Sequence, residues 1–101
     1  MTIRFTFQLR DGMRMAISFP NQSRSYDATR HAVRFWGYDS AMEASFFIDE
    51  QALKHIQADM QFNELGLLRA FDLNRDKILA TAAKVYARGS RGSYDLTSAD
   101  F

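Results

Sequence analysis

The sequence predicts an α+β fold: an antiparallel sheet of four to five strands, with two or three helices packed on one of its faces. Three observations lead to this prediction. The first half of the chain contains two pairs of segments in which apolar and polar residues alternate, as is typical of paired strands. The second half contains apolar residues at helical spacing. A short alternating segment, 93–97, then predicts a closing strand.

The first pair of segments, 2–10 and 13–19, predicts a β-hairpin. Opposed residues of an antiparallel pair lie on the same face of the sheet, so the apolar residues must oppose one another. This requirement gives three pairs: Leu9 with Met13, Phe7 with Met15, and Phe5 with Ile17. It also gives a three-residue loop that ends at Gly12 in the left-handed conformation. Pro20 ends the second strand, because it has no N–H to donate, and the polar residues 21–30 predict a loop.

Residues 32–38 and 42–48 predict a second hairpin, with its tip at 39–40 or slightly wider. One face of this hairpin carries four apolar side chains: Val33, Phe35, Ala44 and Phe46. The other face mixes large apolar and polar groups: Arg34, Trp36, Tyr38, Glu43, Ser45 and Phe47. Because both faces carry large apolar groups, this hairpin is either a central pair of strands or a pair with one face against a partner.

Helices are predicted after the second hairpin. Asp49 is a good N-cap, and the apolar spacing that follows predicts a helix over about 50–60. Asn63 caps a second helical segment over 64–88. One helix of that length is long for this chain, so we expect a kink or break near 72–74, where Asp and Asn favour caps over helix interiors. Whether this segment forms one helix or two stays open.

The composition excludes several classes of protein. The chain has 101 residues, a formal net charge of +1 and no cysteine, so we expect a single domain over 1–101 without disulfides or thiolate chemistry. A charge this close to zero does not attract polyanions as a whole. No apolar run is long enough for a membrane helix, and the start of the chain lacks the apolar block of a signal peptide. We therefore expect a cytoplasmic protein.

The sequence favours a protein that is not an enzyme, with no catalytic residue, no cofactor and no metal site. Residues 72–76 begin like a calcium loop, but Lys77 and Ala83 occupy the positions that need Gly and Glu. His31 and His55 lie in different elements, without the spacing of metal ligands. Phosphate-binding loops, dinucleotide fingerprints and nucleophile elbows are absent from the sequence.

Five residues form the predicted anion-binding or partner-binding set: Arg24, Arg34, Trp36, Arg88 and Arg91. The last two flank the end of the last predicted helix, at a Gly/Ser turn (89–93) whose amides suit an anion. Basic residues at a helix C-terminus commonly offset its dipole instead. The first three lie close in sequence, as in binders of single-stranded nucleic acid. Arginines near aromatic residues more often have a structural role, which here would be stacking of Arg34 on Trp36 or pairing of Arg34 with Glu43.

Five segments resemble the domain-of-unknown-function 1488 family of small bacterial proteins: SFPNQSRSYD (18–27), VRFWGYDS (33–40), FDLNRD (71–76), VYARG (85–89) and SYDLTSADF (93–101). The resemblance covers about residues 17–101 and implies a compact α+β fold. It implies no activity, so no functional residue is carried over. Residues 1–14 fall outside it, as an extra N-terminal strand or the product of an upstream start codon, and their alternation favours the strand.

The sequence is compatible with three functions. We expect a binding or assembly module that forms a homo-oligomer or binds another protein, because an apolar patch on both faces of a hairpin usually meets a partner. The alternative is nucleic-acid or anion binding through the Arg-rich loops. An enzyme of unknown type, using a carboxylate pair drawn from Asp27, Glu43 and Asp49, is the least favoured interpretation.

Overall fold

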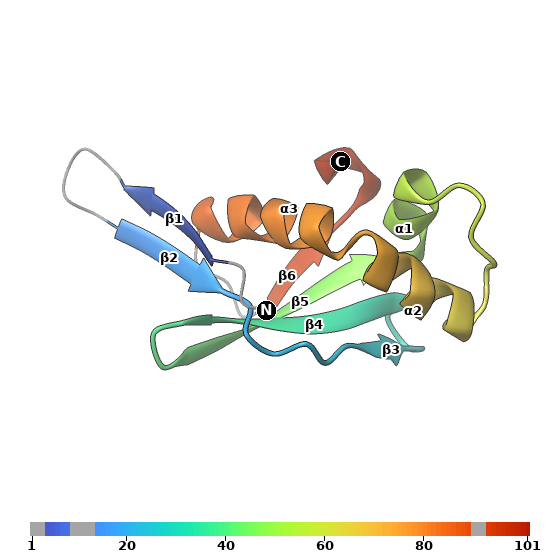
Figure 1. The fold of residues 1–101 in the computed structure, drawn as a ribbon, viewed down its shortest axis with the longest axis horizontal. Coiled ribbons are helices and arrows are strands. Elements are labelled where there is room, and N and C mark those ends of the chain that lie inside the picture. The colour runs from blue at the N-terminus through green and yellow to red at the C-terminus, as the bar shows by residue number, and fades with distance from the viewer. Residues whose placement is uncertain (1–3, 9–13, 90–92) are drawn as a thin grey trace.

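The computed structural model describes residues 4–8, 14–89 and 93–101. Within these ranges one sheet carries helices on one of its faces, which confirms the predicted α+β fold (Figure 1). The strands are β1 (Arg4–Gln8), β2 (Arg14–Ser18), β3 (Ser25–Asp27), β4 (Ala32–Asp39), β5 (Met42–Asp49) and β6 (Ser93–Leu96). The helices are α1 (Glu50–Ile56), α2 (Glu64–Leu73), α3 (Arg75–Ala87) and the 3-10 turn η1 (Ser98–Asp100).

The strands lie in the order β1-β2-β4-β5-β6, and β3 pairs with the remaining part of the β4 edge. All described pairs are antiparallel except one, because β6 runs parallel to β5. The predicted closing strand is therefore confirmed, but in a mixed sheet that is mostly antiparallel. Its direction follows from the path of the chain. After β5 the chain crosses the helical face through α1, α2 and α3, and such a crossover delivers a parallel strand.

Both predicted hairpins are confirmed in the described residues. In the first, Phe5 opposes Ile17 and Phe7 opposes Met15, while the predicted Leu9–Met13 pair and its loop lie outside the described residues. In the second, Phe35 opposes Phe46, and Asp39 opposes Met42 across a loop of two residues, 40–41, one residue later than the predicted tip at 39–40, because Asp39 is still paired in β4. Ser40 adopts a positive φ of 55° at the first loop position, a backbone conformation that tight hairpin turns require.

The prediction of a loop throughout 21–30 is wrong at its centre. Residues Ser25–Asp27 form β3, which pairs with the first three residues of β4. A strand of three residues is too short to show a clear alternation, and its Ser and Asp are typical of loops. The ring of Tyr26 supplies the reason for pairing, since it packs against the apolar core and its hydroxyl donates to Glu50 at 2.5 Å.

The helix caps are confirmed, and the boundaries are refined. The carboxylate of Asp49 accepts the Ala52 N–H at 2.7 Å, and Asn63 accepts the Gly66 N–H at 2.8 Å. The first helix ends at Ile56, earlier than expected, because the chain turns there and the Met60 N–H bonds to the Gln57 carbonyl. The break near 72–74 is confirmed at Asn74, so this segment forms two helices, α2 and α3.

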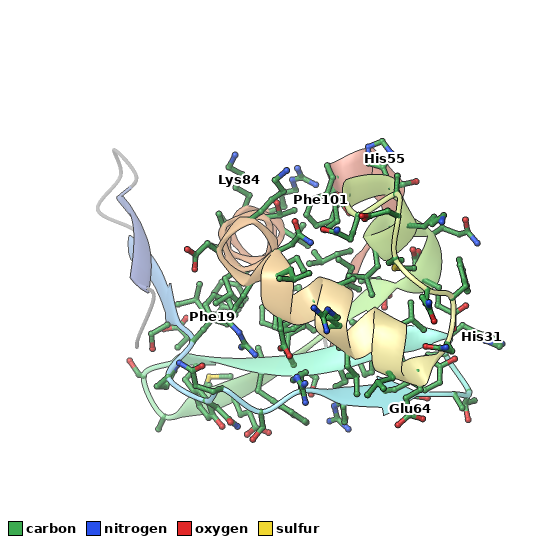
Figure 2. The ribbon with its side chains drawn as sticks, turned by 45° about the vertical axis from the view of Figure 1, so that its right-hand side comes forward. Phe19, His31, His55, Glu64, Lys84 and Phe101 are labelled. Carbon is green, nitrogen blue, oxygen red and sulfur yellow. The ribbon has the colours of Figure 1, made fainter. Side chains whose placement is uncertain are left out.

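One apolar cluster fills the space between the sheet and the helices. At its centre the rings of Phe35 and Phe46 lie 5.3 Å apart, and Phe71 of α2 lies 5.1 Å from Phe35. In Figure 2, the three helices lie on one side of β4 and β5, and Lys84 of α3 points away from the sheet. No helix within the described residues is long and apolar enough to cross a membrane.

Candidate interaction surface

The sheet face that points away from the helices is the first candidate, and we call it the open sheet face. Its outward side chains on β4 and β5 oppose one another in three rows: Arg34 with Phe47, Trp36 with Ser45, and Tyr38 with Glu43. No helix of the described residues covers this side of β4 and β5 (Figure 2). These are the side chains that the alternation predicts on one face of the second hairpin.

Arginines cover the aromatic rings of the open sheet face. The guanidinium carbon of Arg34 lies 5.2 Å from the centre of the Trp36 ring and 5.5 Å from that of Phe47. Arg30 lies 4.1 Å from the Phe47 ring, which is consequently only 6% exposed. The predicted stacking of Arg34 on Trp36 is therefore confirmed. The alternative partner, Glu43, instead accepts a hydrogen bond from the Tyr38 hydroxyl at 2.8 Å.

One donor on this face lacks an acceptor. Arg34 donates from Nη2 to the Ser45 hydroxyl at 2.9 Å, whereas its Nε is buried without any acceptor among the described residues. A buried donor left unpaired costs about 1–3 kcal/mol.

The open sheet face carries charges of both signs. Its cations are Arg30 and Arg34, and Arg30 faces Asp95 of β6 at 3.7 Å. Asp27 accepts the Arg30 backbone N–H at 3.1 Å, while Glu43 lies at the opposite end of the face. A hollow of about 260 Å³ lies beside this cluster, lined by residues that include Arg30, Phe47 and Asp95. Sequence reasoning missed Asp95, because a β6 residue shows its place on this face only once the sheet order is known.

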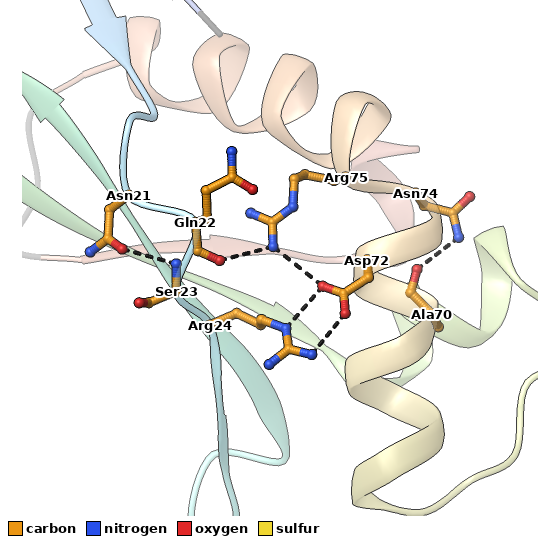
Figure 3. Close-up of polar contacts among 8 residues, drawn as sticks. All are labelled: Asn21, Gln22, Ser23, Arg24, Ala70, Asp72, Asn74 and Arg75. Atoms are coloured by element: carbon orange, nitrogen blue, oxygen red, sulfur yellow. Dashed lines mark hydrogen bonds and ion pairs between the residues drawn. The ribbon is translucent and has the colours of Figure 1, made fainter. Parts of the chain in front are cut away.

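Arg24 is occupied on the helical side of the molecule (Figure 3). Its Nε and Nη2 donate to the two carboxylate oxygens of Asp72 at 2.9 and 2.7 Å. Arg75 donates to the same carboxylate at 3.3 Å and to the Gln22 carbonyl at 3.0 Å. The hydrogen bonds from Arg24 are the main reason why the pKa of Asp72 lies below its ordinary value. This cluster fastens the segment before β3 to the break between α2 and α3.

The remaining predicted residues lie elsewhere. Arg88 follows α3 and forms an ion pair with Asp100 of η1 at 3.3 Å, and Arg91 lies outside the described residues. The structure thus brings together Arg34 and Trp36 on the open sheet face. It separates them from Arg24 and Arg88, each of which already faces a carboxylate.

The carboxylates considered for catalysis have structural partners. Asp49 caps α1, Asp27 accepts the Arg30 N–H, and Glu43 accepts the Tyr38 hydroxyl. Among the residues that the structure describes, no group of three or more His, Asp or Glu side chains is placed to hold a metal ion.

Two tyrosines are held in their neutral form. Burial, together with the hydrogen bond to Asp39, raises the pKa of Tyr86 to about 12. The hydrogen bond to Glu50 likewise raises the pKa of Tyr26. A phenol with a raised pKa remains a hydrogen-bond donor at neutral pH and is not prepared to act as a base.

A family model shows to which family the chain belongs. The family model "Protein of unknown function (DUF1488)" matches residues 17–97. The chain belongs to the DUF1488 family. This confirms the resemblance seen in the sequence, and β1 and most of β2 lie outside the matched residues of this DUF1488 member.

A solved structure supports the same fold. The crystal structure of a protein of unknown function from the DUF1488 family of Shewanella loihica PV-4 superposes with a TM-score of 0.69 at 22% sequence identity. The match covers 77% of this chain and 88% of that one. At this identity the likeness shows the fold alone. No curated protein matches the chain.

Proposed function

We propose that this DUF1488 chain is a non-catalytic assembly module, and that its open sheet face pairs with the same face of a second copy. One observation carries the proposal. The face presents Trp36 and Tyr38, without a helix over them in the described part of the chain, and Phe47 lies beside them under Arg30. Sheets that carry large apolar groups on both faces commonly bury both, and two sheets pack face to face at about 10 Å.

The order of charges along the face supports a second copy as the occupant. Trp36 lies two residues from Arg34 along β4 and two residues from Tyr38, which opposes Glu43. The Arg34 row and the Glu43 row are therefore each about 7 Å from the Trp36 row, on opposite sides of it. A two-fold axis along the Trp36 row sets the Arg34 row of each copy over the Glu43 row of the other. Such self-complementarity is what a symmetric dimer requires.

The same charges favour a protein over a nucleic acid. Phosphate binding needs a surplus of cations, because the affinity comes largely from the release of counterions. On the open sheet face Arg30 and Arg34 are accompanied by Asp27, Glu43 and Asp95. Of the two classes of macromolecule, a partner with both signs of charge therefore fits this face better.

The proposal is tested by light scattering over a series of protein concentrations. We expect the wild-type chain to form dimers reversibly, and Trp36→Glu to be monomeric at concentrations where the wild type is paired, because it buries an unpaired carboxylate at the centre of the interface. Phe62→Ser is the matched control, because Phe62 is exposed on the helical side, and we expect it to dimerise as the wild type does.

Two results would contradict the proposal. The first is a wild-type chain that stays monomeric at the highest concentration measured. The second is a monomeric chain that binds single-stranded DNA with an affinity that falls steeply with salt and is lost in Trp36→Glu. That second result would assign the open sheet face to nucleic acid instead.

A further inference from the structure

A groove lies on the helical side of the molecule, between α2 and the segment that joins it to α1. It encloses about 480 Å³, and its lining includes Met60, Asn63, Leu65, Arg69 and Leu73. We call it the α2 groove. It belongs to the helical layer, so it is separate from the open sheet face and independent of the function proposed for that face.

Two large apolar side chains on the rim of the α2 groove are exposed to solvent. Leu65 is 79% exposed and Leu73 is 63% exposed, while Phe62, in the segment that joins α1 to α2, is 50% exposed. Among the described residues, only Met42 is a further large apolar side chain with such exposure. Exposed apolar side chains gathered around a concavity indicate a binding surface, whereas scattered single ones do not.

The connecting segment is fixed closely against α2. A Cβ atom at Gly66 would lie 2.0 Å from the Gln61 carbonyl oxygen, so only glycine allows this approach. Glycine within a helix costs about 1 kcal/mol relative to alanine. Gly66 is the position at which the joining segment contacts α2, and this contact holds one wall of the groove in place. The groove therefore has its shape before any ligand binds.

A cationic side chain, Arg69, lies at the middle of the apolar rim. Leu65, Arg69 and Leu73 are spaced four residues apart and share one face of α2. The two leucines are about 12 Å apart along the helix, with Arg69 halfway between them. Arg69 forms no hydrogen bond or ion pair with any residue in the described ranges, whereas Asp59 on the far side of the groove accepts from Gln57 at 2.7 Å.

This arrangement disfavours a second copy as the occupant. If α2 packed on its own copy around a two-fold axis, each Leu65 would meet the other copy's Leu73, and the two Arg69 side chains would meet at the centre. Like charges at the centre of an interface repel each other and disfavour the pairing of two copies. A carboxylate in that place satisfies Arg69 with a charge-assisted hydrogen bond.

We propose that the α2 groove docks an amphipathic helix of another protein, whose apolar face carries an acidic residue between two apolar anchors. Helices recognised in grooves present anchors about two turns apart on one face, which is the separation of Leu65 and Leu73. The acidic residue of the incoming helix lies over Arg69, one turn from each anchor.

The test is a selection from a phage-displayed random peptide library, with the full chain as bait. Wild-type bait is expected to enrich peptides that carry Asp or Glu between apolar residues at helical spacing. Arg69→Glu is expected to reverse the preference and enrich peptides with Lys or Arg at that place. Leu65→Ser combined with Leu73→Ser is expected to lose the enrichment. Lys84→Glu, an exposed charge change on α3, is the control and selects as the wild type does.

A synthetic peptide from the wild-type selection supplies the affinity. Exchange of its acidic residue for Lys is expected to weaken binding at least about tenfold, as measured by fluorescence polarisation. Absence of enrichment with wild-type bait would overturn the proposal, as would a charge preference that Arg69→Glu leaves unchanged. A lower mass of the double-serine variant in light scattering would also overturn it, because the groove would then be a contact between copies. All the substituted positions are exposed, and circular dichroism verifies that the variants are folded.

Discussion

Replacement of Phe71 by alanine is expected to lower the free energy of unfolding by about 3–5 kcal/mol. Phe71 is fully buried, its ring lies 5.1 Å from that of Phe35, and the guanidinium carbon of Arg75 lies 4.8 Å from the centre of the Phe71 ring. It is the largest side chain that α2 contributes to the core. The loss removes the contact that holds this helix on the sheet, and the surrounding rings can close the cavity only in part.

Urea unfolding followed by circular dichroism measures the effect. A loss of this size lowers the midpoint by about 2 M urea for a chain of this length. Leu73→Ala is the matched control on the same helix, because Leu73 is 63% exposed, and its free energy of unfolding should change by less than about 0.5 kcal/mol. Equal effects of the two substitutions would show that α2 does not pack on the sheet through Phe71.

Exchange of two charges on the open sheet face is expected to have the largest effect on assembly. Arg34→Glu alone sets a carboxylate over the Glu43 of the second copy, and symmetry produces this conflict twice. Glu43→Arg alone produces the corresponding conflict between two arginines. Breaking a close charge pair at an interface costs about 2–5 kcal/mol, so each single variant should dissociate at least about a hundredfold more readily. The double variant restores opposite charges and should recover most of the affinity.

Sedimentation of the wild type, both single variants and the double variant gives the four dissociation constants. Lys77→Glu is the control for the change in net charge, because Lys77 is exposed on α3, and it should dimerise as the wild type does. Arg34 also contacts Trp36 and Ser45 within its own chain, so thermal unfolding of dilute samples checks that each variant is folded. A double variant as weak as the singles would contradict the arrangement with the two-fold axis.

The sequence predicted most of the elements of the fold for identifiable reasons. Alternation over seven or more residues revealed both hairpins, and the side chains of Asp49, Asn63 and Asn74 marked the helix boundaries. It missed β3, whose three residues are too few for a period to appear. It also could not show that β6 is parallel, because that depends on the path of the chain across the helical face.

The candidate surfaces were predictable to a lesser degree. Alternation alone placed Arg34 and Trp36 on one face. The pairing of Arg24 with Asp72 joins residues 48 positions apart, and a single sequence contains no signal for such a contact. The α2 groove had one weak signal, a glycine at position 66 within a helical pattern, whose meaning depends on how closely the Gln61 carbonyl approaches.

Trp36 allows the proposed assembly to be tested most directly, because it is the only tryptophan in the chain and lies at the centre of the open sheet face. The measurement is acrylamide quenching of its fluorescence over a range of protein concentrations that spans dissociation. If two open sheet faces pair, emission shifts to the blue and quenching weakens as the concentration rises. Quenching that stays the same while light scattering reports a dimer would show that the copies meet elsewhere, and would contradict pairing through the open sheet face.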